Sequence, residues 1–329
     1  MAKAAVGQIC SSASMAHNLE QCVNLVGRAA AAGAKVLFLP EASDYIATSA
    51  QESLHLARPV SQSPFVAGLQ SAAAEHRVAV HVGIHVPVTV KPTVATATTT
   101  TTTTTTTVPV SEPAENGNTE TPTTTTTTKL YNRTILITPS GTLDASATYD
   151  KLHLFDYGTL RESASTQAGA SLTAPFASPV GRAGSLICFD LRFPEPALAL
   201  ARPGAGSPFR GNPAQVLLFP SAFTVPTGRA HWEVLLRARA IETGAWVIAA
   251  AQVGRHHGAG GKRVSYGRSL VVDPWGKVVL ELKGVKGGAD DEPDTWEAED
   301  GAVGQLGIVD VDLDMWDRVR ERMPLKRRT

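Results

Sequence analysis

Cys188 is the residue whose type and position most clearly suggest chemistry. It lies in Gly184–Glu195, where an apolar run stops at the cysteine and an aromatic, an acid and an arginine follow. Proline is tolerated in the first turn of a helix, so Pro194 predicts that a strand ends near Cys188 and a helix begins soon after. A thiol on such a turn lies beside backbone N–H groups, which suits a nucleophile. The alternative is a small core residue, because free cysteine is among the most buried residue types.

Three charged residues could act with such a thiol. Glu41 directly follows the apolar run Val36–Leu39 and Pro40, and α/β folds place their chemistry at the ends of buried strands. Lys151 lies between apolar neighbours, where a lysine is costly unless it has an acidic partner. Glu162 follows in a polar loop. The alternative for Glu41 is a solvated loop acid, although its immediate neighbours are apolar.

The other reactive side chains favour structural interpretations. His81 and His85 lie on one face of a predicted strand and could ligate a metal, but no Cys/His cluster with zinc-type spacing accompanies them. We interpret both as core or interface histidines, and Cys10 and Cys22 as core cysteines within predicted elements. The sequence therefore predicts neither a metal site nor a cofactor.

Composition limits the class of protein. The 329 residues suffice for one large domain or two medium ones, and a net charge of zero gives no indication of nucleic acid or an anionic membrane as partner. No apolar run approaches the ~20 residues of a membrane span, and no secretory signal is evident. Three cysteines, an odd and sparse number, favour reduced thiols. We expect a cytoplasmic protein, with a mitochondrial pool left open.

Apolar periodicity predicts strands and helices in alternation, with two antiparallel hairpins, which suits mixed sheets packed face to face and covered by helices. We expect the first helix to be capped by Asn18 and another to span Ala230–Thr243, with Ile241 in its buried stripe. The predicted strands are Ala4–Ile9, Val36–Leu39, Val78–Val86, Leu130–Ile137, Val180–Ile187, Gln215–Phe219, Trp246–Val253, Ser265–Val272, Lys277–Leu282 and Leu306–Leu313.

Two segments lack this periodicity. Pro92–Thr128 is dominated by threonine, and such a tract cannot bury enough apolar surface to offset its ordering entropy. We interpret it as a disordered insertion within one domain of residues 1–329, because a strand resumes at Leu130. Gly284–Gly301 is acidic and rich in glycine, and we expect it to be a mobile loop.

Several segments together resemble the nitrilase, or carbon–nitrogen hydrolase, superfamily. Glu, Lys and Cys in this order, each at the end of an apolar run, are typical of that family. The segments are Leu39–Ala42, Tyr149–Asp156, Leu186–Glu195 and Pro220–Phe223. Further segments resemble the branch that contains deaminated glutathione amidase, namely His231–Thr243, Ala249–His257, Ser265–Gly267 and Val271–Gly276.

The resemblance implies an α/β fold of the α-β-β-α sandwich type, with two mixed sheets flanked by helices. It further implies four layers per monomer and eight in a homodimer that forms helix to helix. The helix Ala230–Thr243 is then a candidate interface element. The alternative, an ordinary helix that covers its own sheet, is equally open.

The resemblance also implies roles for the charged residues. Cys188 attacks an amide carbon while Glu41 accepts the thiol proton, and a thioester forms that water then hydrolyses. Lys151 assists the thiolate and faces the tetrahedral oxyanion, with the backbone N–H of Phe189 as a second donor. Glu162 orients the Glu41–Lys151 pair or the substrate.

For the substrate, the resemblance implies a 2-oxo acid with a terminal amide, such as deaminated glutathione, cleaved to a carboxylate and ammonia. Arg192, Phe223 and Thr227 match the residues that contact the keto-acid end. The alternative for Arg192 is a salt bridge to Asp190 or Glu195.

Other functions remain possible. An ω-amidase acting on 2-oxoglutaramate is the nearest alternative, and a true nitrilase is a more distant one. A Cys–His hydrolase would use His153 or His231 as its base. A catalytically silent interaction protein would leave the Glu–Lys–Cys set unused.

Overall fold

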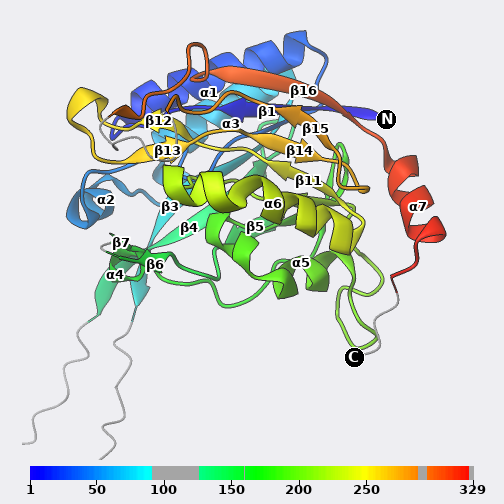
Figure 1. Cartoon of the computed structure of the whole chain (residues 1–329). Helices are drawn as coiled ribbons and strands as arrows, with labels where there is room; N and C mark the ends of the chain where they lie inside the picture. The colour runs from blue at the N-terminus through cyan, green and yellow to red at the C-terminus, as the bar shows by residue number, and fades with distance from the viewer. Residues whose placement is uncertain (91–125, 159, 288–294, 326–329) are drawn as a thin grey trace, which may run out of the picture.

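Two six-stranded sheets form the body of the protein. The computed structural model describes residues 1–90, 126–158, 160–287 and 295–325 (Figure 1). The first sheet has the order β16-β1-β2-β3-β4-β5 and the second β8-β9-β10-β11-β14-β15. Read in these orders, both sheets repeat one succession of pairings: antiparallel, parallel, parallel, antiparallel, antiparallel. The prediction of two mixed sheets is therefore confirmed.

Most strands follow the predicted apolar runs, but Leu143–Asp150 and Phe176–Ser178 lie outside them. Those of the first sheet are β1 (Ala2–Gln8), β2 (Val36–Phe38), β3 (Ala79–Val90), β4 (Thr127–Ile137), β5 (Leu143–Asp150) and β16 (Gln305–Val311). Those of the second sheet are β8 (Phe176–Ser178), β9 (Gly181–Ser185), β10 (Val216–Leu218), β11 (Trp246–Ala249), β14 (Leu270–Val272) and β15 (Val278–Glu281). Two small antiparallel pairs join β6 (Asp156–Tyr157) to β7 (Leu160–Arg161) and β12 (Val253–Arg255) to β13 (Val264–Tyr266).

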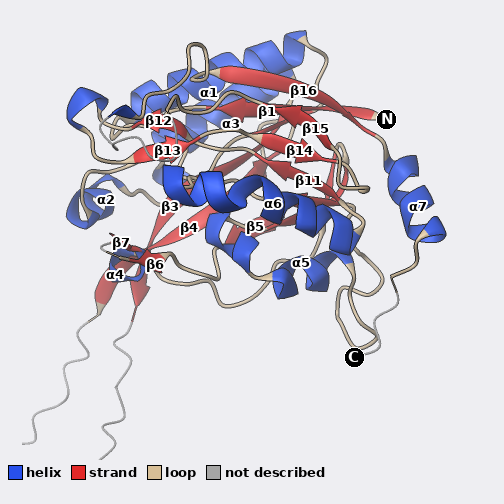
Figure 2. Cartoon of the chain, viewed as in Figure 1, coloured by secondary structure: helices blue, strands red, loops and turns tan. Residues whose placement is uncertain are grey.

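Helices cover the outer face of each sheet. In Figures 1 and 2, α1 (Met15–Ala31) and α3 (Pro64–His76) lie on one side, and α5 (Pro194–Ala201) and α6 (Val225–Thr243) on the other. In β2 the side chains of Val36 and Phe38 join the core between the sheets, whereas Leu37 joins the cluster under α1 and α3. A strand buried on both faces needs such a continuous apolar run. The α-β-β-α sandwich is confirmed, whereas the dimer remains a prediction.

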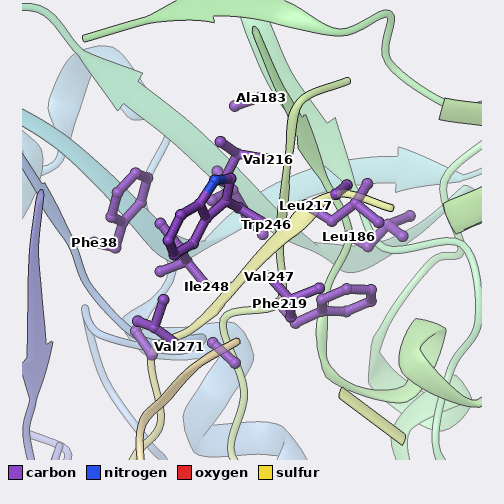
Figure 3. Close-up of a cluster of buried hydrophobic side chains, with 14 of the residues drawn as sticks. Phe38, Ala183, Leu186, Val216, Leu217, Phe219, Trp246, Val247, Ile248 and Val271 are labelled. Carbon is purple, nitrogen blue, oxygen red and sulfur yellow. The ribbon is translucent and has the colours of Figure 1, made fainter. Parts of the chain in front are cut away.

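The core between the sheets holds the strand ends in place. Figure 3 shows Phe38 of β2 among side chains from β9, β10 and β11, including Trp246. Beyond the sheets, the described residues also include the short helices α2 (Ala50–Leu56), α4 (Glu162–Ser165) and α7 (Leu313–Arg322) and the 3-10 turns η1 (Val60–Gln62), η2 (Cys188–Arg192) and η3 (Gly258–Gly260). No helix in the described part of the chain is long and apolar enough to cross a membrane.

Two helix predictions were wrong in detail. The cap of α1 is Ser14, whose hydroxyl accepts from the His17 N–H. Asn18 instead lies buried within the helix, where its amide donates to the carbonyl of Asp44 at 2.9 Å. Helix α6 begins at Val225, five residues earlier than expected, because proline fits its first turn. Its Ile241 is exposed, since the buried stripe follows Trp232, Leu236 and Ala240.

The two segments without periodicity also differ from expectation. Strand β4 begins at Thr127 and pairs with the end of β3, so the threonine tract is strand for its last residues, while residues 91–125 lie outside the described part. In Gly284–Gly301, residues 288–294 are not described. The flanks are not a mobile loop, because Val285, Trp296 and Ala298 pack in a cluster with Val225 and Val253.

Candidate active site

Cys188 begins η2, at the sharp turn that follows β9. Its backbone has φ = 47°, in the left-handed region, which costs a non-glycine residue roughly 1–2 kcal/mol. The turn is fixed by a bond from the Cys188 N–H to the carbonyl of Pro220 at 3.0 Å. The predicted strand-to-turn junction is therefore present, and the surrounding structure holds it in a strained conformation.

Asp190 stabilises this turn from inside. Its fully buried carboxylate accepts from the Ile187 N–H at 2.9 Å, the Tyr149 hydroxyl at 2.7 Å and the His153 backbone N–H at 3.0 Å. It also contacts His153 Nδ1 at 2.7 Å, and the His153 ring stacks on Phe193 with centroids 3.8 Å apart. Asp190 thus positions the turn and is not the partner of Arg192, contrary to that alternative.

Glu41, Lys151 and Glu162 form one buried ionic cluster. Glu41 follows β2, Lys151 follows β5, and Glu162 begins α4. The Lys151 ammonium donates to Glu41 Oε1 at 2.9 Å and to Glu162 Oε2 and Oε1 at 2.9 and 3.1 Å. Lys151 was expected to have one acidic partner and has two. Segments that are distant in sequence bring the three side chains together.

Asn132 completes the cluster, and the sequence analysis missed it. Its side-chain amide donates to Glu41 Oε1 at 2.6 Å and to Glu162 Oε1 at 3.1 Å. Asn132 lies on β4 and is almost fully buried. The signal was strand alternation, which places Asn132 on the same face as Leu130 and Leu136, since a buried polar group needs partners. The same reasoning had already drawn attention to Lys151.

Electrostatics set the resting charges. Burial raises the pKa of the Glu41 carboxyl, but Lys151 and its hydrogen bonds outweigh this, so the net shift is downward. Burial lowers the pKa of Lys151, whereas the two carboxylates raise it, and the net shift is well upward. Burial, then the charge of Glu41, raise the pKa of the Cys188 thiol, which is hydrogen-bonded to that carboxylate. The resting cluster is a carboxylate, an ammonium and a neutral thiol.

One cavity connects these groups. Its volume is about 1140 Å³. The eight residues that the resemblance assigns to catalysis or substrate binding all line it: Glu41, Lys151, Glu162, Cys188, Phe189, Arg192, Phe223 and Thr227. His153 and His231 are absent from its lining. Neither histidine is therefore placed to serve as the base of a Cys–His pair.

The three candidate substrate-binding residues differ in how many of their hydrogen-bonding groups remain available to a ligand. The Arg192 guanidinium contacts His231 Nδ1 at 2.9 Å and lies over the Phe189 ring at 5.7 Å, which leaves further N–H groups for the cavity. Phe223 packs on Trp232, with centroids 4.9 Å apart. The Thr227 hydroxyl is already hydrogen-bonded to the Thr224 hydroxyl at 2.8 Å. Arg192 is the strongest anion-binding candidate of the three.

The other singled-out side chains have structural surroundings. His81 is buried and contacts the Ser185 hydroxyl at 3.1 Å, and His85 contacts Asp44 Oδ1 at 3.0 Å. Burial lowers the pKa of His81 to about 3, so it stays neutral. Among the described residues, no group of three or more His, Cys, Asp or Glu side chains could hold a metal ion.

These shifts predict a broad pH plateau. Because Lys151 holds the pKa of Glu41 below its ordinary value, kcat/KM should stay constant until the pH falls below about 4.3. On the alkaline side, the raised pKa values of Cys188 and Lys151 preserve the same protonation state, so the plateau should extend beyond about pH 9. The measurement is kcat/KM against pH for a non-titrating amide. A rise of about tenfold per pH unit toward 8.5 would instead indicate an ordinary free thiolate.

Comparison with known proteins agrees with this geometry. The carbon–nitrogen hydrolase family model matches residues 3–321. The chain is 36% identical to the probable hydrolase nit2 of Schizosaccharomyces pombe (100% of this chain, 98% of that protein). It is 40% identical to human deaminated glutathione amidase (84% of this chain, 71% of that protein). The Caenorhabditis elegans NitFhit crystal structure superposes with a TM-score of 0.73 at 32% identity, covering 100% of this chain and 66% of that one.

Proposed function

Because the chain belongs to the carbon–nitrogen hydrolase family, we propose that it is an amidase that cleaves the ω-amide of a 2-oxo acid, with deaminated glutathione as its preferred substrate. One observation carries the proposal. The Glu41–Lys151 ion pair, the Cys188 thiol and the Arg192 guanidinium line the same cavity. A nucleophile, a base, a cation and a carboxylate-binding group are therefore available to one bound molecule.

Acylation follows from the resting charges. The Cys188 sulfur attacks the amide carbon as Glu41 takes the thiol proton along their hydrogen bond. Negative charge develops on the substrate oxygen, which faces Lys151 and the Phe189 N–H in the first turn of η2. Losing one such donor typically costs about 3 kcal/mol of barrier. Lys151 already donates to one oxygen of Glu41 and to both oxygens of Glu162. Its longer contact to Glu162, at 3.1 Å, is the one that can open so that an N–H turns to the substrate oxygen.

Deacylation reuses the same base. Glu41 gives its proton to the departing nitrogen, the C–N bond breaks, and a thioester remains on Cys188. Water then attacks the thioester while Glu41 removes its proton. The C–S bond of the second tetrahedral intermediate breaks to release the acid, and Glu41 returns the proton to the Cys188 sulfur. Throughout the reaction, the hydrogen bond to Glu162 keeps Lys151 in position, and the hydrogen bond from Asn132 keeps Glu41 in position.

The two candidate substrates differ in their leaving groups. In deaminated glutathione the ω-amide nitrogen belongs to cysteinylglycine, so hydrolysis releases that dipeptide as an amine. Only a primary amide such as 2-oxoglutaramate releases ammonia, so the expected release of ammonia is wrong for deaminated glutathione. An assay of both products over a panel of ω-amides tests the proposal. Deaminated glutathione should give the highest kcat/KM, and turnover of 2-oxoglutaramate alone would favour an ω-amidase.

Arg192 provides a sharper test of substrate class. Its planar guanidinium can bind a carboxylate through two parallel hydrogen bonds, which a lysine cannot reproduce. Arg192→Lys should therefore raise KM for 2-oxo acid amides by about tenfold or more, with little change for a neutral amide. Arg237→Lys on the exposed face of α6 is the matched control, because Arg237 lies outside the cavity. An equal loss on charged and neutral amides would remove Arg192 from substrate recognition.

A further inference from the structure

The cavity contains more positive charge than one 2-oxo acid requires. Among the described residues, its lining has five cationic side chains and two carboxylates, a net formal charge of +3, in a chain whose net charge is zero. The cations are Lys151, Arg161, Arg192, Lys262 and Arg263. A cleft lined by one sign of charge raises the local concentration of ligands of the opposite sign. The excess points to a ligand with more than one anionic group.

Three of these cations, Arg161, Lys262 and Arg263, have no role in the reaction derived above. Lys151 is neutralised by Glu41 and Glu162, and Arg192 is assigned to the 2-oxo acid end. Lys262 and Arg263 lie between η3 and β13, where both are exposed and neither forms an ion pair with another described residue. Figure 1 shows β12 and β13 on the same side of the molecule as α2, whose first residues also line the cavity.

A second observation points to the same place. His257 Nε2 and Trp296 Nε1 are buried atoms without a hydrogen-bond partner among the described residues. Both residues line the cavity together with Lys262 and Arg263. An unsatisfied buried polar atom costs about 1–3 kcal/mol, so each such atom calls for an explanation. The indole N–H is closed off from solvent in this structure, so a ligand oxygen could accept from it only after a small shift of the Trp296 side chain.

Trp296 is held firmly enough to act as a wall. Its backbone carbonyl accepts from the Arg255 guanidinium at 3.1 Å, and Arg229 lies 5.5 Å from its ring centroid. Trp296 also packs against the cluster that contains Val253 and Val285. The indole therefore offers a fixed apolar surface next to two flexible cations, which suits a short chain that ends in a carboxylate.

We propose that Lys262 and Arg263, backed by Trp296, form a second anion subsite that binds a carboxylate on the leaving-group side of the scissile amide. This inference rests on the proposed function. A carboxylate offers about four acceptor sites, to which the exposed ammonium and guanidinium can donate. The cavity of about 1140 Å³ also exceeds the roughly 300–1,000 Å³ usual for drug-sized ligands. It can hold a substrate that extends on both sides of the amide carbon.

The test compares two substrates that differ only at the far end. One is deaminated glutathione, and the other is the same molecule with its C-terminal carboxylate converted to a carboxamide. In the unaltered enzyme, KM should be about tenfold lower for the carboxylate, with similar kcat, because the interaction is equal in the ground and transition states. In the Lys262→Met/Arg263→Met variant this difference should shrink to about twofold or less. Lys277→Met, exposed and outside the cavity, controls for a general loss of charge.

Binding of both molecules to Cys188→Ala by calorimetry makes the test independent of turnover. Tighter binding of the carboxylate form, lost when Lys262 and Arg263 are also replaced, supports the subsite. This holds even if the enzyme hydrolyses no 2-oxo acid amide, because absence of turnover would refute only the proposed function. Turnover of both substrates with equal KM, or an equal effect of the double variant on both, overturns the subsite and leaves the amidase proposal standing.

Discussion

Replacing Glu41 by glutamine is expected to lower kcat/KM by about 10²–10⁴-fold, the usual contribution of a positioned general base. The thiol is neutral at rest because burial and the Glu41 charge raise its pKa, so the attack requires a proton acceptor within hydrogen-bond reach. The amide of glutamine has the shape of the carboxylate but cannot take the proton. Steady-state kinetics with the preferred amide measures the loss.

The same variant should fold normally. Lys151 retains Glu162 at 2.9 Å, so its charge stays paired when Glu41 is neutralised. Thermal unfolding followed by circular dichroism should therefore show a similar melting temperature. Glu281→Gln, on the edge strand β15 and outside the cavity, is the matched control for loss of a carboxylate. Activity of Glu41→Gln above about one tenth of the unaltered enzyme would exclude Glu41 as the base.

Lys151→Met should affect both stability and catalysis. The variant leaves the carboxylates of Glu41 and Glu162 facing one another without their shared cation. Removing one partner of a buried ion pair costs roughly 3–5 kcal/mol. Because the oxyanion also loses a donor worth about 3 kcal/mol, kcat should fall by about 10²-fold or more. Chemical denaturation and steady-state kinetics on the same preparation measure the two effects.

A double variant separates the two roles of Lys151. Lys151→Met/Glu162→Gln removes one of the uncompensated carboxylates, so it should recover part of the lost stability without recovering activity. In the single variant Glu41 stays buried without Lys151, so the pKa of its carboxyl should rise above the unfolded value and the stability should improve as the pH falls toward about 4.3. A Lys151→Met protein as stable as the unaltered chain, or one with undiminished kcat, would contradict the cluster described above.

The sequence predicted the strand ends better than the contacts between them. Val36–Leu39 and the run before Cys188 are continuous apolar segments, and these patterns located the sheet edges that present Glu41 and the thiol. Glu41 and Lys151 are 110 residues apart, so nothing local specifies their distance. The resemblance to a family supplied that link, and the structure shows its geometry.

Other residues of the cavity could not be identified from the sequence pattern. Lys262 and Trp296 lie in segments without periodicity, where neither burial nor partners follow from spacing. Thr227 was placed before a helix, but it lies in the first turn of α6, where its hydroxyl bonds Thr224. Asn132 could have been found, because strand alternation places it on the same face as Leu130 and Leu136, where a buried amide needs partners.

The central claim is that the Cys188 sulfur bonds covalently to the acyl part of the substrate. The most direct measurement is mass spectrometry of the enzyme quenched in acid during turnover of deaminated glutathione, followed by peptide mapping. The account predicts an added mass equal to the acyl fragment on the peptide that contains Cys188, and no adduct and no turnover with Cys188→Ala. An adduct on Cys10 or Cys22 instead, or full turnover by Cys188→Ala, would contradict it.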